Sequence, residues 1–213
     1  MLNLVNIAIQ FWWVWLLLIV ILYVKSKPKS PQFKGSIGEK IIKQSVIWQL
    51  PKDLYISLHD IYIKDSLGTT QIDHLIVSPY GLFVIETKHM KGWIFGKAED
   101  KSWTQKLYKQ SHTFQNPLRQ NYRHQKALAE TLNLNLNSIY SVIVFTGDCQ
   151  LKGEMPPNVF QGMSYIKYIR SFEKRVFTEH EKDKLVELIK TERLPNTRAI
   201  RKEHLRELQK KYS

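Results

Sequence analysis

The chain has 213 residues, 43% hydrophobic and 24% charged, a composition that suits a globular domain and excludes an intrinsically disordered chain. Its net charge of +13 favours a polyanionic partner, either nucleic acid or the anionic face of a membrane, although a basic protein can also simply be soluble. The single cysteine, Cys149, excludes an intramolecular disulfide and a cysteine-based metal cluster.

Residues 4–24 contain no charged side chain, and 21 residues at helical rise span about 30 Å, the thickness of the hydrocarbon layer. No Lys or Arg precedes this run and no small-residue cleavage site follows it, which favours a retained transmembrane anchor over a cleaved signal peptide. Four lysines follow the run: Lys25, Lys27, Lys29 and Lys34. Because basic residues stay on the cytoplasmic side, we expect a single-pass cell-membrane protein whose domain faces the cytoplasm. Residues 1–24 form the anchor in this interpretation, and residues 25–34 a basic linker.

The next elements alternate between helical and extended patterns. Apolar spacing predicts a helix over residues 36–50, ended by Pro51. Residues 54–63 are rich in Ile and Tyr and predict a strand. Residues 71–88 predict two strands joined by the turn at residues 78–81, and residues 92–96 a short strand or a turn.

A second helix is expected after Asn116, a good N-cap that is followed by Pro117. Residues 138–148 then predict an apolar strand, while residues 159–169 are ambiguous. A further helix over residues 177–193 has Thr178 as its N-cap and Glu181 at the capping-box position. The tail after residue 198 is basic and permits a helix. Overall, the order is helix, three strands, helix, strand, which predicts an α/β (α+β) fold.

The predicted hairpin carries unexpected charges. Asp73 and Glu86 can be brought to the end of the hairpin away from its turn, and Lys88 shares a strand face with Glu86. Two converging carboxylates repel each other unless a cation lies between them, and oxygen ligands suit Mg²⁺ or Mn²⁺. A lysine beside such an ion is the combination that phosphodiester hydrolysis requires. The alternative is a salt-bridged strand end without chemistry.

Several separate motifs resemble the NERD (nuclease-related domain) family of the PD-(D/E)xK nuclease superfamily. They are "GSIGE" at 35–39, "QIDHLIVSPYGLFVIETK" at 71–88, "GWIFG" at 92–96, "WTQ" at 103–105 and "FQNPLRQN" at 114–121. The resemblance implies a restriction-endonuclease-like core, a mixed sheet flanked by helices, over residues 35–150. Residues 151–213 lie outside it as a basic, partly helical C-terminal extension.

The resemblance also implies roles for individual residues. Asp73 and Glu86 would be metal ligands, with the backbone carbonyl of Thr87 as a third, for Mg²⁺ or Mn²⁺. Lys88 would be the catalytic lysine. Glu39, on the first helix, would bind the metal through water or orient the site. Gln120, on the later helix, would position substrate or Lys88.

Other residues have both functional and structural interpretations. The basic helix face of Arg119, Arg123 and Lys126 is expected to contact phosphate, or else only solvent. His124 follows Gln120 by one helical turn and could touch phosphate or be solvated. His74 should point away from Asp73, as a core or surface histidine rather than a ligand. For Trp93 and Trp103, packing is favoured over stacking on bases.

The sequence therefore predicts a membrane-anchored, metal-dependent nuclease that acts on nucleic acid, DNA in preference to RNA. The alternative is a membrane-tethered module with the same fold that binds nucleic acid, or acts as a scaffold, without cutting. The presence of Asp73, Glu86 and Lys88 together favours the enzyme, because a scaffold would not need all three.

Overall fold

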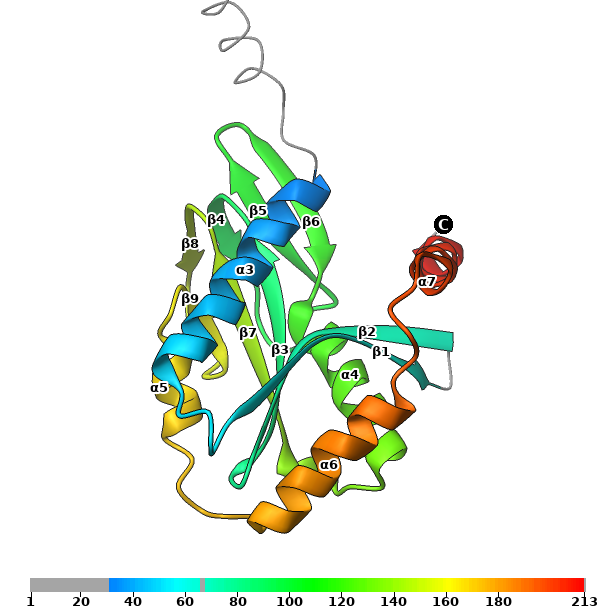
Figure 1. Cartoon of the computed structure of the whole chain (residues 1–213). Helices are drawn as coiled ribbons and strands as arrows, with labels where there is room; N and C mark the ends of the chain where they lie inside the picture. The colour runs from blue at the N-terminus through cyan, green and yellow to red at the C-terminus, as the bar shows by residue number, and fades with distance from the viewer. Residues whose placement is uncertain (1–30, 66–67, 213) are drawn as a thin grey trace, which may run out of the picture. The chain divides into compact units, whose positions relative to one another are not determined.

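A computed structural model describes residues 31–65 and 68–212 of the chain (Figure 1). The chain divides into two compact units, Met1–Lys34 and Gly35–Ser213, and of the first the structure describes only residues 31–34, the beginning of α3 (Pro31–Gln49). The predicted anchor at residues 4–24 lies outside the described residues. Within residues 31–65 and 68–212, none of the helices is both long enough and apolar enough to cross a membrane.

The main sheet of the second unit is mixed and has five strands. Its spatial order is β1-β2-β3-β7-β9. The strands are β1 (Ile56–Asp65), β2 (Gly68–Ser78), β3 (Gly81–His89), β7 (Ile139–Thr146) and β9 (Val159–Gln161). The first three form an antiparallel meander, whereas β7 runs parallel to β3 and β9 parallel to β7. The expected three-strand meander and later strand are thus confirmed, and so is a mixed sheet flanked by helices.

A second sheet continues from the first. Its order is β6-β5-β4-β8, made of β4 (Gly92–Phe95), β5 (Ser102–Leu107), β6 (Gln110–Gln115) and β8 (Cys149–Lys152). The parallel pair β3 and β7 leads directly into the parallel pair β4 and β8. Gly92, the first residue of β4, and Gly147, which lies between β7 and β8, have φ of 77° and 89°, a left-handed conformation that a residue with a Cβ seldom adopts. These two glycines therefore allow both strands to bend at the same level.

Helices cover both faces of the main sheet (Figure 1). On one face, α3 and α5 (Tyr165–Arg170) pack over a core that includes Ile42, Phe83 and Ile169. On the other face, α4 (Pro117–Leu132) and α6 (Glu179–Glu192) pack over a core that includes Leu75, Leu128 and Ile189. The described residues also form η1 (Leu136–Ser138) and α7 (Arg198–Tyr212).

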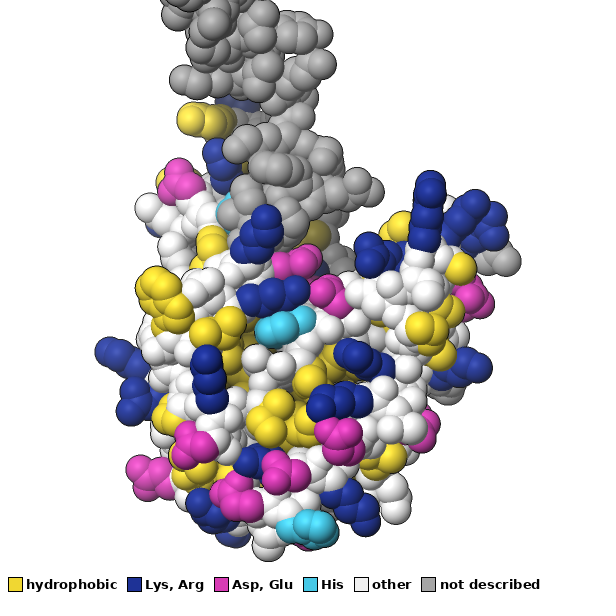
Figure 2. All heavy atoms as spheres, viewed as in Figure 1, with side chains coloured by type: hydrophobic (Ala, Val, Ile, Leu, Met, Phe, Trp, Pro, Cys, Tyr) yellow, Lys and Arg dark blue, Asp and Glu magenta, His cyan; other side chains and the backbone are white. Residues whose placement is uncertain are grey.

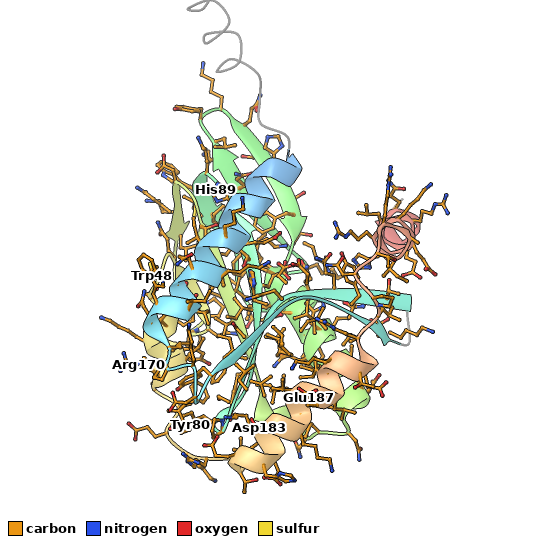
Figure 3. All side chains as sticks on the ribbon, in the orientation of Figure 1. Trp48, Tyr80, His89, Arg170, Asp183 and Glu187 are labelled. Atoms are coloured by element: carbon orange, nitrogen blue, oxygen red, sulfur yellow. The ribbon has the colours of Figure 1, made fainter. Side chains whose placement is uncertain are left out.

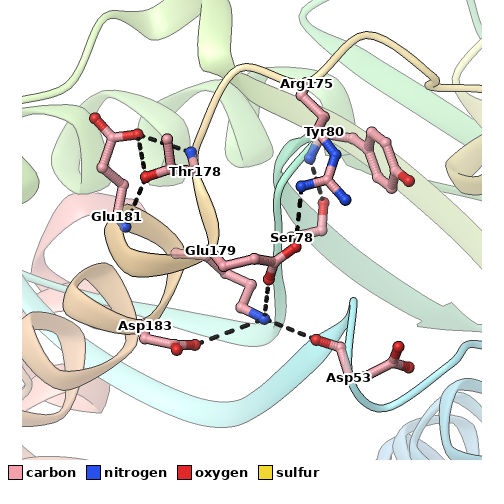
Figure 4. Close-up of polar contacts among 9 residues, drawn as sticks. Asp53, Ser78, Tyr80, Arg175, Thr178, Glu179, Glu181 and Asp183 are labelled. Atoms are coloured by element: carbon pink, nitrogen blue, oxygen red, sulfur yellow. Dashed lines mark hydrogen bonds and ion pairs between the residues drawn. The ribbon is translucent and has the colours of Figure 1, made fainter.

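Both predicted N-caps are confirmed. The side chain of Asn116 accepts a hydrogen bond from the backbone N–H of Leu118 at the start of α4. At α6, the hydroxyl of Thr178 accepts from the N–H of Glu181, and the Glu181 carboxylate accepts from the N–H of Thr178 (Figure 4). This reciprocal capping box satisfies donors that the helix itself leaves unpaired.

Two segments differ from the sequence-based picture. Helix α3 begins at Pro31, inside the predicted linker, and a proline fits a first helical turn because its missing N–H has no partner there anyway. The segment set apart as an extension contributes β9 to the main sheet and α5 and α6 to its two faces. The ambiguous residues 159–169 form the short strand β9 and most of the short helix α5.

Candidate active site

The register of the β2–β3 hairpin brings the two predicted carboxylates together. Pairing runs from Ser78 with Gly81 at the turn to His74 with Ile85. Asp73 and Glu86 occupy the next opposing positions, and opposed residues of an antiparallel pair point to the same face of a sheet. The backbone N–H of Thr87 donates to Asp73 Oδ2 at 3.3 Å, which ties the two strand ends together.

Glu86 is only 2% exposed, and Lys88 supplies its counter-charge. The Lys88 ammonium donates to Glu86 Oε1 at 2.7 Å and to Gln120 Oε1, on α4, at 2.9 Å. Burial alone would raise the pKa of Glu86, but the positive charge of Lys88 and the nearby ring of His124 outweigh it, and the pKa is lowered. Glu86 is therefore ionised, and Lys88 is held between strand and helix.

Asp73 has the opposite electrostatic balance. Burial raises the pKa of Asp73 well above its usual value, and the negative charge of Glu86 raises it further. The charge of Lys88 and the hydrogen bond from Thr87 act against these effects without cancelling them. A cation placed beside both carboxylates would relieve this repulsion.

His124 stands on the other side of Glu86. Its Nε2 lies 3.4 Å from Glu86 Oε2, and its Nδ1 is 2.7 Å from the hydroxyl of Thr70 on β2. If the Thr70 hydroxyl donates to Nδ1, the remaining ring proton lies on Nε2 and faces Glu86. His124 is buried, at 4% exposure, so of its two interpretations, phosphate contact or a solvated histidine, the second is ruled out. It contacts a site carboxylate from the helix that also carries Gln120.

The donor atoms at the hairpin end fit a hard divalent cation. In the described part of the chain, no three His, Cys, Asp or Glu side chains stand close enough together to hold a metal ion. The candidate ligands are instead two carboxylates, Asp73 and Glu86, and the backbone carbonyl of Thr87. Mg²⁺ characteristically takes one or two carboxylates and retains several waters. Glu86 Oε2 is buried and, within the described residues, accepts no hydrogen bond, so an oxygen ligand is available there.

Glu39 approaches the site because of the glycine before it. A Cβ at Gly38 would lie 2.7 Å from Thr146 Oγ1 and 3.1 Å from Thr87 Cγ2, so only glycine lets α3 pack this closely on β3 and β7. Glu39 is near enough to raise the pKa of Asp73, and burial followed by the charge of Asp60 raises the pKa of Glu39 itself. The structure thus brings Glu39 near the site.

The asparagines of the "FQNPLRQN" motif position α4. The side chain of Asn116 donates to the backbone carbonyls of Lys97, Ala98 and Asp100, which fastens the preceding loop. Asn121 is fully buried and donates to the carbonyl of Val84 on β3 at 2.8 Å. The motif therefore fixes the helix against the strand that carries Glu86 and Lys88.

The predicted basic face of α4 is only partly available. Arg123 pairs with Asp65, with Nη2 to Oδ1 at 3.0 Å, and also donates to the carbonyl of Thr69. Arg119 is exposed and donates to the backbone carbonyl of Glu99. Lys126 is exposed. Of the three, Arg123 is held by an internal ion pair, whereas Arg119 and Lys126 present their charge at the surface.

The packing of Trp103 and of His74 decides between the structural and functional interpretations of these two residues. Trp103 is fully buried, stacks parallel to Phe145 with 6.0 Å between ring centroids, and donates from Nε1 to the carbonyl of Lys97. His74 is buried on the sheet face opposite Asp73, 2.8 Å from His59 between their Nδ1 atoms. Neither residue reaches the site. Trp93, in contrast, is 47% exposed.

A cavity of about 280 Å³ opens beside the carboxylates. Its lining includes Asp73, Gln120, Arg123 and His124 from the predicted set. It also includes residues that the sequence did not single out: Thr70, Gln71, Gln115 and His204. Gln71 precedes Asp73 by two positions on one strand face, a signal that could have found it. His204 comes from α7, far along the chain, and no local pattern indicates its place.

Comparison with known proteins gives a consistent picture. A sequence model of the nuclease-related domain family matches residues 34–146, which span α3 through β7 and every site residue except His204. An uncharacterized protein from Bacillus anthracis is 36% identical over 149 residues, covering 70% of this chain and 68% of its own length. No solved structure matches.

Proposed function

The chain belongs to the nuclease-related domain (NERD) family, and we propose that it is a divalent-metal-dependent nuclease that hydrolyses phosphodiester bonds, with DNA as its substrate. One observation carries the proposal. Lys88 is held at 2.7 Å from the buried carboxylate of Glu86 and at 2.9 Å from Gln120, beside a cavity that Asp73 and Gln120 line. A positioned ammonium next to two carboxylates suits a reaction in which negative charge grows on a phosphate.

Each group has a distinct task in this reaction. Asp73, Glu86 and the Thr87 carbonyl would hold Mg²⁺ or Mn²⁺, which when bound would act as a Lewis acid and lower the pKa of a coordinated water. Lys88 stabilises the charge that develops on the phosphoryl oxygens as water attacks. Gln120 keeps the ammonium directed at the cavity, because its amide oxygen fixes one of the three N–H donors.

His124 and Glu39 complete the arrangement without touching the reacting bond in this proposal. His124 borders Glu86 Oε2 and limits where that carboxylate can turn. Glu39 adds a third acidic group near Asp73, which suits a water-mediated contact with the cation. The exposed Arg119 and Lys126 would contact the phosphates of the bound strand.

We also propose that residues 4–24 anchor the protein in the cell membrane with the nuclease domain in the cytoplasm. The support is the uncharged run itself and the four lysines that follow it. Protease added to intact cells should leave the domain undigested. Digestion from outside, or a mature chain that begins after residue 24, would contradict the proposal.

The test of the nuclease proposal uses the full-length chain with plasmid, single-stranded DNA and RNA in separate reactions. We expect cleavage of DNA in Mg²⁺ or Mn²⁺ that stops on addition of EDTA and is lost in Asp73→Asn. The matched control is Asp183→Asn, which removes an exposed carboxylate on α6, away from the site (Figures 3 and 4). A chain that binds these nucleic acids but cuts none of them with either ion would instead be the non-catalytic binding module.

A further inference from the structure

One face of the second sheet points away from the core and has an unusual composition. Directly paired residues share a face, so the register groups Trp93 and Phe95 of β4 with Lys106 and Thr104 of β5. The same register adds Thr113 of β6 and Lys152 of β8 to this set, called here the outer face. The opposite side of the sheet carries Ile94, Trp103 and Phe114, which pack into the core.

The outer face combines two exposed aromatic rings with two lysines, and Glu99, Asp100 and Glu154 line a cavity next to Phe95 and Lys152 at its edge. Trp93 and Phe95 are both exposed, and Lys152 Nζ lies 4.9 Å from the centroid of the Trp93 ring. None of the strands β4, β5, β6 and β8 contains an Asp or a Glu. On the side of the molecule drawn in Figure 2, by comparison, blue basic and magenta acidic side chains are interspersed. An acid-free sheet with aromatic side chains is complementary to a polyanion that has flat rings.

A hollow of about 470 Å³ adjoins this face. Its lining includes the rings of Trp93 and Tyr108 and the side chains of Lys91 and Lys106, with Asp148 as its single acidic residue. Tyr108 lies at the tip of the β5–β6 hairpin and is 100% exposed. The lining of the hollow thus includes two aromatic residues and two lysines.

We propose that the outer face and this hollow bind a single-stranded stretch of nucleic acid, an inference that rests on the proposed nuclease function. Bases stack on Trp93 and Phe95, because every base has a π-face and such stacking tolerates any sequence. The backbone phosphates pair with Lys106 and Lys152, and the Lys152 ammonium moves from the Trp93 ring to a phosphate as the base takes its place.

The outer face leads to the cavity that Asp73 lines. Gln115 ends β6 on the same side of the sheet as Thr113, since alternate residues of a strand share a face, and it lines the cavity with Asp73 and Gln120. From Ser111, which pairs with Lys106, to Gln115 is about 14 Å at the rise of a β-strand. A strand lying on the outer face can therefore continue into the cavity. This continuity favours nucleic acid over anionic lipid, the other partner that suits aromatic and lysine side chains.

The test measures binding of a labelled single-stranded DNA 20-mer to the full-length chain in EDTA, which suppresses cleavage, as a function of salt. The variants are Trp93→Ala, Trp93→Phe and Lys106→Gln. The controls are Trp48→Ala, a ring 77% exposed on α3 (Figure 3), and Lys184→Gln on α6. Thermal melts check that every variant folds, and vesicles containing phosphatidylserine give a parallel binding assay.

We expect Trp93→Ala to weaken oligonucleotide binding about tenfold or more, and Trp93→Phe to keep most of the affinity. Lys106→Gln should reduce the slope of log K against log salt by about 0.7, the value for one phosphate contact on a single strand. Both controls should bind like the wild type.

The outcomes separate this inference from the function on which it rests. If the wild type cleaves DNA in Mg²⁺ and Trp93→Ala binds and cleaves DNA equally well, the proposed role of the outer face is refuted, while the proposed nuclease function stands. A wild type that neither binds nor cleaves refutes both proposals. If Trp93→Ala and Lys106→Gln lose vesicle binding but keep oligonucleotide binding, the inference is overturned, and the outer face binds a lipid surface instead.

Discussion

Replacement of Lys88 by methionine tests two roles of the lysine: stabilising the buried, ionised carboxylate of Glu86 in the folded protein, and promoting the cleavage reaction. Lys88→Met keeps an unbranched apolar side chain but removes the ammonium. Glu86 Oε1 then loses its donor at 2.7 Å, while Glu86 Oε2 lies 3.4 Å from His124 Nε2 and, within the described residues, accepts no hydrogen bond. The carboxylate remains in a position that is 2% exposed. The variant therefore leaves a buried charge without its partner.

The size of the effect follows from the exposure of the two partners. Removal of one member of a fully buried ion pair costs about 3–5 kcal/mol. The Lys88 side chain is 24% exposed, so water reaches the pair and we reduce the expected loss to about 2 kcal/mol. For a chain of this length that corresponds to a fall in Tm of about 4–8 °C. The assay is a thermal melt of the full-length chain in EDTA.

A double-mutant cycle isolates the pair from other effects. In Glu86→Gln with Lys88→Met both charges are absent, so the double variant should be more stable than Lys88→Met alone, with a coupling of about 1–2 kcal/mol. Single-turnover cleavage should be absent in Lys88→Met, because the ammonium acts on charge that develops in the transition state. A double variant no more stable than Lys88→Met, or a Lys88→Met that cuts like the wild type, would refute this reasoning.

Three further predictions concern the same site. Because the pKa of Asp73 is raised in the folded state, its ionisation opposes folding. The stability that protonated Asp73 contributes is complete below about pH 4, the pKa of Asp73 in the unfolded chain. It is lost as the pH rises through the pKa of Asp73 in the folded state. In EDTA, Asp73→Asn should therefore melt above the wild type at pH 7 and show no such advantage near pH 3; equal melting at both values would contradict this. Calorimetry should show Mg²⁺ or Mn²⁺ binding to the wild type and none to Asp73→Asn, and equal binding would place the ion elsewhere. Gly38→Ala should cost about 1–3 kcal/mol in urea unfolding, since its Cβ would lie 2.7 Å from Thr146 Oγ1, and an unchanged midpoint would show that α3 shifts freely.

Local patterns in the sequence predicted much of this structure. The Asn116–Pro117 start of α4 and the capping box of Thr178 and Glu181 depend on neighbouring residues only, and both are present. The hairpin turn between Ser78 and Gly81 fixes the register, and the register in turn opposes Asp73 to Glu86. Short-range chemistry thus sufficed for the carboxylates and for the lysine that follows them.

Features that depend on distant partners could not be predicted in this way. Strands β5 and β6 are short and largely polar, so apolar alternation does not reveal them, and their place depends on Trp103 and Phe114 packing against Phe145. The sequence around His124 does not indicate that this residue is buried, because its contacts Thr70 and Glu86 lie on β2 and β3, far from α4 in the sequence. His204 reaches the cavity only because α7 packs against β2 through Thr69.

The parallel pairing of β3 with β7 has a consequence for how the protein is made. The strand that carries Glu86 and Lys88 pairs locally with β2, but its other neighbour joins it only through contacts such as Leu82 with Ile139, 57 positions further along (139 − 82). Long-range pairing of this kind forms late, after the intervening chain has been ordered. During synthesis the strand that carries Glu86 and Lys88 therefore lacks one edge, and α4 with Gln120 lacks its support, until β7 has left the ribosome. A growing chain would therefore not hold Glu86, Lys88 and Gln120 in their final arrangement until the residues up to Thr146 had been made.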